Sequence, residues 1–481
     1  MDCLANMKLY FFVYLTPLVF IGCFNGSSES DSDTYFGGEI IKPNNNYVVL
    51  ENSLKNRDTF YLNDDNRFLE PVKNLQPGVY RFQHGDEFQT LILEGSDSLL
   101  FRLNTDDFDE SLVYTGRGAK KNNFLIQSYL DDESKERELV KHQQMEPEEF
   151  QRHVDMERRK KFESFERFLS KTPQSELFRD IVTASIDYNF FYYREKYPFG
   201  HYGENKLVHF KDLPDGFYDF RAAIDYNKEE LIELTSYRRF LFWHFNNLAL
   251  AEFYPDGKHI RFDRQSLKYN VAKLNLIVEK VENEKIKNFL LRSMTSYYLL
   301  NNDNAENSAM MLTEYLKKAS DQTDKDYIKG FYDNLESLKP GNPIPNSELY
   351  TYGRDQVELR SIITKPTVVF CWLSRNKMHT RNSHYMAKSL KARFPEINFI
   401  AINATDNDLE NWKRTVSKFD YPSEHEYLFK NTQEAIDKYV MSYGHKVFIL
   451  DKNGIIQNSN ASLFGSEIQD ELETLLATST K

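Results

Sequence analysis

Cysteine is scarce in this chain: its 481 residues include three, Cys3, Cys23 and Cys371. Three cysteines cannot build a framework of disulfides, so each one needs its own explanation. The sequence also lacks the short motifs of nucleotide, zinc-protease and calcium sites. It has no G-x-x-x-x-G-K-[ST], no G-x-G-x-x-G, no H-E-x-x-H and no EF-hand loop. We therefore predict no cofactor and no metal site.

Basic residues are also fewer than acidic ones. Lys and Arg number 61 against 73 Asp and Glu, which gives a net charge of -12 at pH 7. An acidic chain repels a phosphate backbone, so we expect no nucleic acid partner. Apolar residues are plentiful, at 40% of the chain. This fraction supports packed cores and excludes wholesale disorder, and the length predicts more than one domain.

The N-terminal residues are typical of a targeting segment rather than of a domain. Lys8 precedes an apolar run, residues 9–21, which is too short to span a bilayer comfortably. Gly22 and Cys23 end this run as a bacterial lipobox does, which predicts that Cys23 is lipidated and anchors the chain in a membrane. The alternative is an ordinary secretory signal with an incidental cysteine. The polar, acidic residues 24–34 suit a flexible tether.

Two different hydrophobic patterns follow the tether. Residues 35–122 contain at least five short runs of β-branched and aromatic residues between turn residues, which predicts a small antiparallel β-sandwich. Residues 123–338 switch to helical periodicity. Within them, Thr172 followed by Pro173 predicts a helix start, with Thr172 as the N-cap. We therefore expect an all-α middle region.

Residues 339–481 alternate between predicted strands and helices. A strand over Thr367–Trp372 leads into a helix over residues 377–394. A second strand, "INFIAINA", two further helices, a hairpin around "KVFILDKNGII" and a closing helix come next. The order β-α-β, hairpin, helix is typical of thioredoxin. The Pro- and Gly-rich stretch "LKPGNPIPN" precedes this unit and predicts a linker.

Several stretches carry a resemblance to a known family. "GNPIPN", "KPTVVFCWLS" and "VFILDKNGII" are similar to landmarks of the membrane-tethered thiol-disulfide oxidoreductases of the TlpA/ResA class, over residues 341–475. "YFGGEIIKPNNNYVVL" and "LEGSDSLLFRLN" resemble the extra domain that precedes such modules in Bacteroidetes-type lipoproteins. The resemblance implies a C-terminal thioredoxin-like domain and, for the family, thiol-disulfide exchange.

The residues that carry this activity in the family are replaced here. The family's first cysteine is a thiolate stabilised by a helix N-terminus, and its second resolves the mixed disulfide. Asn376 and His379 occupy those two places and can do neither. His445 stands where the family has a cis-proline facing the site. We therefore expect no dithiol chemistry. The stretch in place of C-x-x-C reads Asn376, Lys377, Met378, His379.

The residue types around the start of the predicted helix over residues 377–394 suggest other roles. Asn376 is a good N-cap for the helix that follows. Arg375, Lys377 and His379 surround a helix N-terminus with basic groups, so a site for a small anion or an acidic peptide is a second hypothesis. Cys371 lies at the end of a buried strand and is expected to be a small buried hydrophobe. The alternative is that Cys371 reacts, alone or with a partner thiol.

Together these features predict a multidomain α+β protein with an N-terminal antiparallel β-sandwich, an all-α middle region and a C-terminal α/β thioredoxin-like domain. We expect a TlpA-type lipoprotein in the cell envelope of a Gram-negative bacterium, periplasmic or at the outer membrane. It would contact the lipid membrane through Cys23 and bind or scaffold envelope proteins or peptides. A divergent thiol-disulfide oxidoreductase in cell redox homeostasis is the alternative, so enzymatic activity stays open. The predicted segments are signal peptide 1–23, tether 24–34, β-sandwich 35–122, helical region 123–338 and thioredoxin-like domain 339–481.

Overall fold

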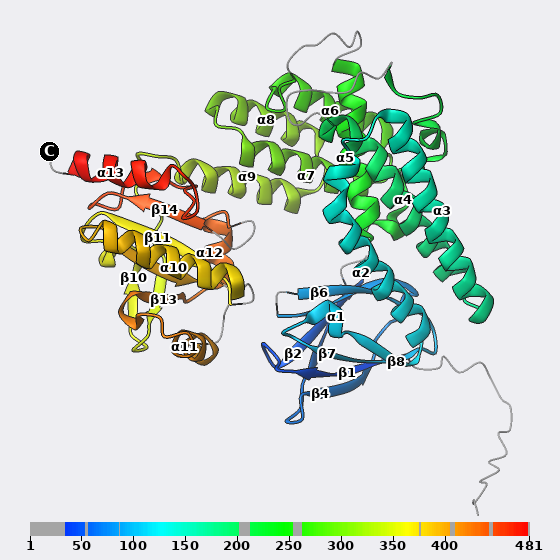
Figure 1. The fold of residues 1–481 in the computed structure, drawn as a ribbon, viewed down its shortest axis with the longest axis horizontal. Coiled ribbons are helices and arrows are strands. Elements are labelled where there is room, and N and C mark those ends of the chain that lie inside the picture. Colours follow the sequence, from blue (N-terminus) through cyan, green and yellow to red (C-terminus); the bar gives the residue numbers. More distant parts are fainter. Residues whose placement is uncertain are drawn as a thin grey trace, which may run out of the picture.

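The computed structural model arranges the chain in three regions that follow one another along the sequence (Figure 1). Strands come first (blue), helices fill the middle (cyan to green), and a second region of strands and helices ends the chain (yellow to red). Four predicted site residues, Cys23, Arg375, Asn376 and His445, lie outside the described residues, as does the side chain of Lys377. The structure describes residues 34–52, 56–85, 87–201, 212–253, 262–374, 377–404, 409–441 and 446–479.

Two four-stranded sheets make up the N-terminal region, with the orders β4-β1-β7-β8 and β3-β2-β5-β6. Neighbouring strands are antiparallel, apart from the parallel pair β1–β7, which confirms the predicted antiparallel sheets. Phe36 is fully buried between the sheets, with the ring centroids of Phe101 and Phe68 5.4 and 5.6 Å away. The strands are β1 (Tyr35–Ile41), β2 (Tyr47–Asn52), β3 (Arg57–Tyr61), β4 (Arg67–Pro71), β5 (Gly78–His84), β6 (Glu87–Leu93), β7 (Ser98–Asn104) and β8 (Val113–Arg117).

Helices α2 to α9 form the middle region. Five of them begin after a Ser, Asn or Asp whose side chain accepts a hydrogen bond from a backbone N–H of the first turn. The predicted N-cap Thr172 is wrong. Ser175 caps α4 instead, because its Oγ accepts from the Phe178 N–H at 3.1 Å, and Thr172 ends the helix before it. The helices are α2 (Ala119–His142), α3 (Pro147–Lys171), α4 (Glu176–Gly200), α5 (Thr235–Phe253), α6 (Leu267–Lys280), α7 (Glu284–Asn301), α8 (Ala305–Lys318) and α9 (Gln322–Ser337); the short α1 (Phe108–Ser111) precedes them.

A buried asparagine joins the N-terminal sheets to the helices. Asn122 in α2 accepts a hydrogen bond from the Ile92 N–H at 2.8 Å and donates one to the Ile92 carbonyl at 3.0 Å. Ile92 on β6 and Val79 on β5 belong to the same hydrophobic core as the helices. Because the two regions share a core, they pack against each other and are not joined by a flexible linker alone.

The C-terminal region is a seven-stranded sheet with the order β10-β9-β13-β12-β11-β14-β15. The parallel strands β11 and β12 are connected through α10, and an antiparallel hairpin, β14–β15, precedes α13. This is the predicted thioredoxin-like arrangement. The short strands β9, β10 and β13, which extend the sheet beyond β12, were not predicted. The elements are β9 (Glu348–Thr351), β10 (Gln356–Glu358), β11 (Thr367–Trp372), α10 (Lys377–Arg393), β12 (Asn398–Asn403), α11 (Leu409–Lys418), β13 (Glu426–Phe429), α12 (Thr432–Lys438), β14 (Lys446–Leu450), β15 (Ile456–Asn458) and α13 (Ile468–Ser479).

None of the helices in the described ranges is long and apolar enough to cross a membrane.

The Asn122 junction makes a first prediction. Replacing Asn122 with Ala leaves the N–H and the carbonyl of Ile92 buried without their partner, so the free energy of unfolding should fall by about 2 to 4 kcal/mol. Urea denaturation followed by circular dichroism measures this change. Gln127→Ala is the matched control, because Gln127 is an exposed amide in the same helix. Equal stability of the two variants would show that the junction contributes little.

Candidate functional site

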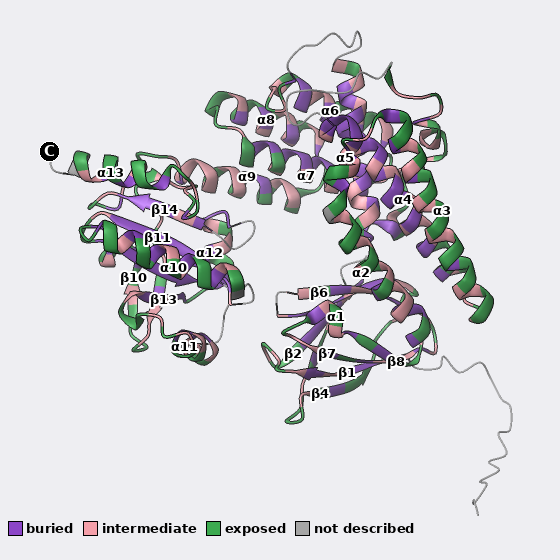
Figure 2. Cartoon of the chain, viewed as in Figure 1, coloured by how far each residue is buried: buried purple, intermediate pink, exposed green. Residues whose placement is uncertain are grey.

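Strand β11 places its last two side chains on opposite faces of the sheet. Trp372 packs in the core that also contains Phe370, whereas Cys371 belongs to the core on the other face. Figure 2 shows β11 buried within the sheet. Cys371 is 3% exposed, and burial raises the pKa of its thiol to about 12, with Lys446 on the neighbouring strand only partly opposing the rise. Within the described ranges it is the one free cysteine, and this environment keeps its thiol protonated.

Between β11 and α10 the structure describes Leu373 and Ser374 but not residues 375 and 376. These four residues form the corner between the strand and the helix. Helix α10 begins at Lys377, close to its predicted start, and Met378 in its first turn is 76% exposed. His379 is half-buried, with the Phe464 ring centroid 5.6 Å from its own, and burial lowers the pKa of this imidazole. The Thr380 hydroxyl donates to the Leu373 carbonyl at 2.8 Å, which ties the first turn of α10 to the end of β11. The corner is thus closed by a side-chain hydrogen bond.

A buried polar cluster that the sequence analysis missed lies beneath this corner. The Glu426 carboxylate, 2% exposed, accepts a hydrogen bond from the Trp372 indole Nε1–H at 3.1 Å. Its other oxygen lies 2.9 Å from His384 Nε2. His384 Nδ1 lies 2.7 Å from the Thr380 carbonyl oxygen. The cluster therefore links β11, β13 and the first two turns of α10.

The hydrogen bonds place one proton of this cluster on His384 and a second between His384 and Glu426. A carbonyl can only accept, so His384 Nδ1 carries a hydrogen. One further proton then lies between His384 Nε2 and the facing Glu426 oxygen. The pair has no net charge whichever atom holds that proton, which suits a site shielded from water. Burial raises the pKa of Glu426, and the hydrogen bonds from His384 and Trp372 oppose the rise only partly.

Tyr421 covers the histidine of the cluster. Its ring stacks on His384 with the centroids 3.6 Å apart and the planes 3° from parallel. Burial, followed by the charge of Glu426, raises the pKa of the Tyr421 phenol to about 12. Its hydroxyl oxygen is buried and has no hydrogen-bond partner among the described residues. The cluster is therefore an enclosed support for the helix rather than an open reactive centre.

The two histidines of α10 contact different residues. His379 faces Phe464 and lies within reach of the Ser383 hydroxyl, at 3.3 Å, whereas His384 faces Glu426. The part of the chain that the structure describes contains no group of three His, Cys, Asp or Glu side chains that could hold a metal ion. Glu426 could not be predicted from the sequence, because it lies on a four-residue strand that shows no clear period.

No family profile and no curated protein matches the sequence. The thioredoxin domain of a thiol-disulfide oxidoreductase from Bacteroides vulgatus matches 30% of this chain and 98% of its own, with 18% identity and a TM-score of 0.25. A thiol:disulfide interchange protein from a Bacteroides species matches 29% and 92%, with 17% identity and a TM-score of 0.26. A thioredoxin-like protein from Bacteroides caccae matches 53% and 89%, with 13% identity and a TM-score of 0.32.

The buried carboxyl predicts a pH dependence of stability. Because burial raises the pKa of Glu426 above its ordinary value of 4.5, the folded state binds more protons than the unfolded chain between the two pKa values. The free energy of unfolding should therefore fall as pH rises through this window, by at most about 1.4 kcal/mol per pH unit. Glu426→Gln cannot ionise, so its stability relative to wild type should improve as pH rises from about 4.5.

Urea denaturation of wild type and variant across this pH range measures the effect. Glu424→Gln, an exposed carboxyl two residues away, is the control and should keep the wild-type profile. If the free energy of unfolding changes with pH in the same way for wild type and Glu426→Gln, then Glu426 has the same pKa in the folded and the unfolded chain.

Proposed function

We propose that this chain is a TlpA-type, thioredoxin-like protein of the cell envelope that binds peptides or partner proteins and does not exchange disulfides. The observation that carries the proposal is the placement of Cys371, which is buried on the face of β11 opposite Trp372. Burial raises the pKa of this thiol to about 12, so it stays protonated at neutral pH and lacks the thiolate that disulfide exchange requires. Asn376 and His379 supply no thiol where the family has its cysteines.

The exposed side of α10 supports a binding role. Met378 and Tyr385 are 76% and 74% exposed, and their seven-residue spacing places them on one face of the helix. Phe464, 49% exposed, lies beside His379 at the same end. Exposed large apolar side chains gathered at one place are typical of surfaces that bind other proteins. Such a surface suits the side chains of a docked peptide.

The charge of α10 favours an acidic ligand. The helix contains five Lys and Arg residues and no Asp or Glu, in a chain whose net charge is -12. Backbone N–H groups at a helix N-terminus also favour anions. The proposal therefore includes an anion site at this end, in which Arg375, Lys377 and His379 would contact an acidic peptide or a small anion.

The second candidate is a divergent thiol-disulfide oxidoreductase that uses Cys371 or a partner thiol. The fold favours it, since thiol-disulfide exchange is what the names of two matched structures describe. It requires the thiol to reach solvent, and Cys371 lies among core residues such as Phe448 and Tyr439. A covalent role would therefore need this core to open and expose Cys371, which makes binding the better supported function.

The proposal predicts no thiol-disulfide turnover. In an insulin-reduction assay with dithiothreitol, wild type and Cys371→Ala should both stay at the background rate. The double variant Asn376→Cys, His379→Cys restores the C-x-x-C spacing at the start of α10, where the helix N-terminus stabilises a thiolate. Its rate should exceed that of wild type, so it also serves as the positive control. A wild-type rate that disappears in Cys371→Ala would favour the oxidoreductase.

We further propose that the chain is lipid-anchored through Cys23, as its lipobox-like context suggests. Cys23→Ala should move the protein from the membrane fraction to the soluble fraction, because acyl chains on this residue would be the attachment. Cell fractionation followed by immunoblotting checks this, with Cys3→Ala as the matched control that stays in the membrane fraction. Continued membrane association of Cys23→Ala would contradict the anchor and leave the binding proposal untouched.

A further inference from the structure

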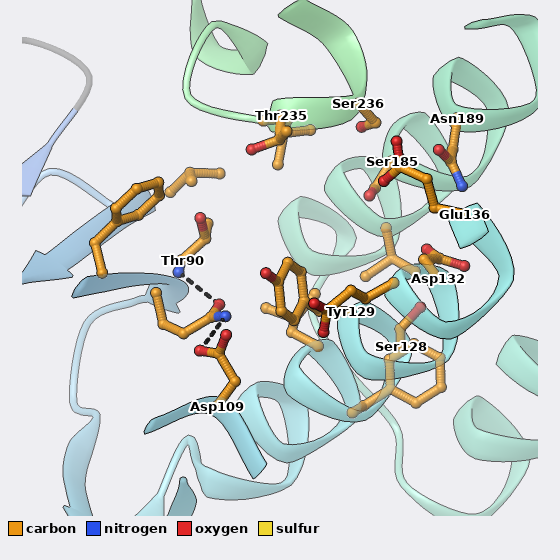
Figure 3. A pocket seen from close by; sticks show the side chains of 18 of the residues that line it. Thr90, Asp109, Ser128, Tyr129, Asp132, Glu136, Ser185, Asn189, Thr235 and Ser236 are labelled. Atoms are coloured by element: carbon orange, nitrogen blue, oxygen red, sulfur yellow. Dashed lines mark hydrogen bonds between the residues drawn. The ribbon is translucent and has the colours of Figure 1, made fainter. Parts of the chain in front are cut away.

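A cavity of about 810 Å3 lies between the N-terminal sheets and the helical region. Residues of β6 and α1 line one side of it, and residues of α2, α4 and α5 the other. Figure 3 shows Asp109 and Tyr129 reaching into this space opposite Ser236. Ile92 also lines the cavity and makes both backbone hydrogen bonds with the Asn122 side chain, so the junction between the two regions fixes the walls.

Acidic groups dominate the lining. Eight of the lining residues are Asp or Glu, and one, Arg239, is basic. Arg239 is already engaged, because it pairs with Glu136 and donates to the Tyr192 hydroxyl at 2.9 Å. Asp132 is paired as well, with Lys161 Nζ 2.7 Å away. Asp106 is paired with Lys42. The other carboxylates that act on Asp109 are Glu110 in α1 and Glu133 in α2, so negative charge gathers where these two helices meet.

The charged neighbours that act on Asp109 are themselves acidic. Burial raises the pKa of Asp109, the hydrogen bond from Gln89 Nε2 at 2.8 Å opposes the rise, and the charges of Glu110 and Glu133 add to it. The pKa of Tyr129 beside it is raised to about 12 by burial and by Asp109 and Glu133. A cation placed among these groups would relieve their mutual repulsion.

Aromatic, apolar and hydroxyl groups complete the lining. Tyr129 is 43% exposed, so its ring is accessible to a ligand, and an aromatic face attracts cations. The ring of Phe88 also lines the cavity, but Arg81 already lies over it, 5.2 Å from the centroid. Ile92 and Val182 contribute a buried apolar floor. The Ser236 hydroxyl oxygen is shielded from solvent and has no hydrogen-bond partner among the described residues. A buried polar atom of this kind is satisfied when a ligand supplies the partner.

We infer that this cavity binds an alkylammonium group, carried either by a free diamine or by a lysine side chain of a polypeptide. Asp109 and Glu133 provide the negative charge, and Tyr129 provides an aromatic wall. The apolar floor accommodates the alkyl stem, and Ser236 faces a polar atom farther along the ligand. The site lies outside the thioredoxin-like region, so it does not depend on the function proposed for that region.

Isothermal titration of the full chain with cadaverine and with the peptide acetyl-Gly-Lys-Gly-amide tests the inference. We expect at least one of the two amines to bind with a dissociation constant below about 1 mM, and the neutral 1-pentanol to bind more weakly. Tighter binding of cadaverine identifies a free amine as the ligand, and tighter binding of the peptide identifies a lysine side chain. Asp109→Asn should weaken the preferred amine about tenfold, because a charge-assisted contact is lost.

Two further variants separate this site from general charge effects. Glu133→Gln changes an exposed carboxyl, so it should fold normally and also weaken binding. Glu306→Gln removes the same charge from an exposed position of α8, which does not line the cavity, and should bind as wild type does. The inference is overturned if neither amine binds, if 1-pentanol binds as tightly, if Glu133→Gln keeps full affinity, or if Glu306→Gln loses as much.

Discussion

The C-terminal region depends on one constraint, the burial of β11 on both faces. All six residues of this strand are buried, because β12 and β14 flank it and a separate hydrophobic core packs on each side. Successive side chains of a strand point to opposite faces. Trp372 therefore reaches the core beneath α10, and Cys371 must enter the other core. Because β11 lies in the middle of the sheet, the Cys371 thiol is buried, and Cys371 acts as a packing residue.

The burial of Trp372 accounts for the polar cluster. A buried indole N–H needs an acceptor, and Glu426 supplies it at 3.1 Å. A buried carboxyl is costly unless it has further partners, and His384 provides one from α10. Each polar group thus requires the next, and the chain of contacts ends at the backbone of α10. In this way the helix keeps its position at the corner without any cysteine.

The sequence predicts the regular parts of this structure well and its short parts poorly. Long runs with a clear period, such as β11 and α10, could be placed to within a residue or two. Strand β13 has four residues, too few to show a period, so Glu426 and its cluster could not be anticipated. The start of α4 was misplaced because Thr172 and Ser175 are both good caps, and only the folded backbone shows which hydroxyl meets an N–H. The cavity was missed because its walls come from regions far apart in sequence.

The chain presents two candidate surfaces of opposite charge. Helix α10 has five basic residues and no acidic one, whereas the cavity beside α1 has eight acidic residues and one basic. An alkylammonium group that suits the cavity is repelled by α10, and an acidic peptide that suits α10 is repelled by the cavity. At physiological salt the Debye length is about 8 Å, so each field acts mainly on a ligand close to its own surface. Ligands of opposite charge therefore suit different surfaces of the same chain, and higher salt should weaken the binding of both.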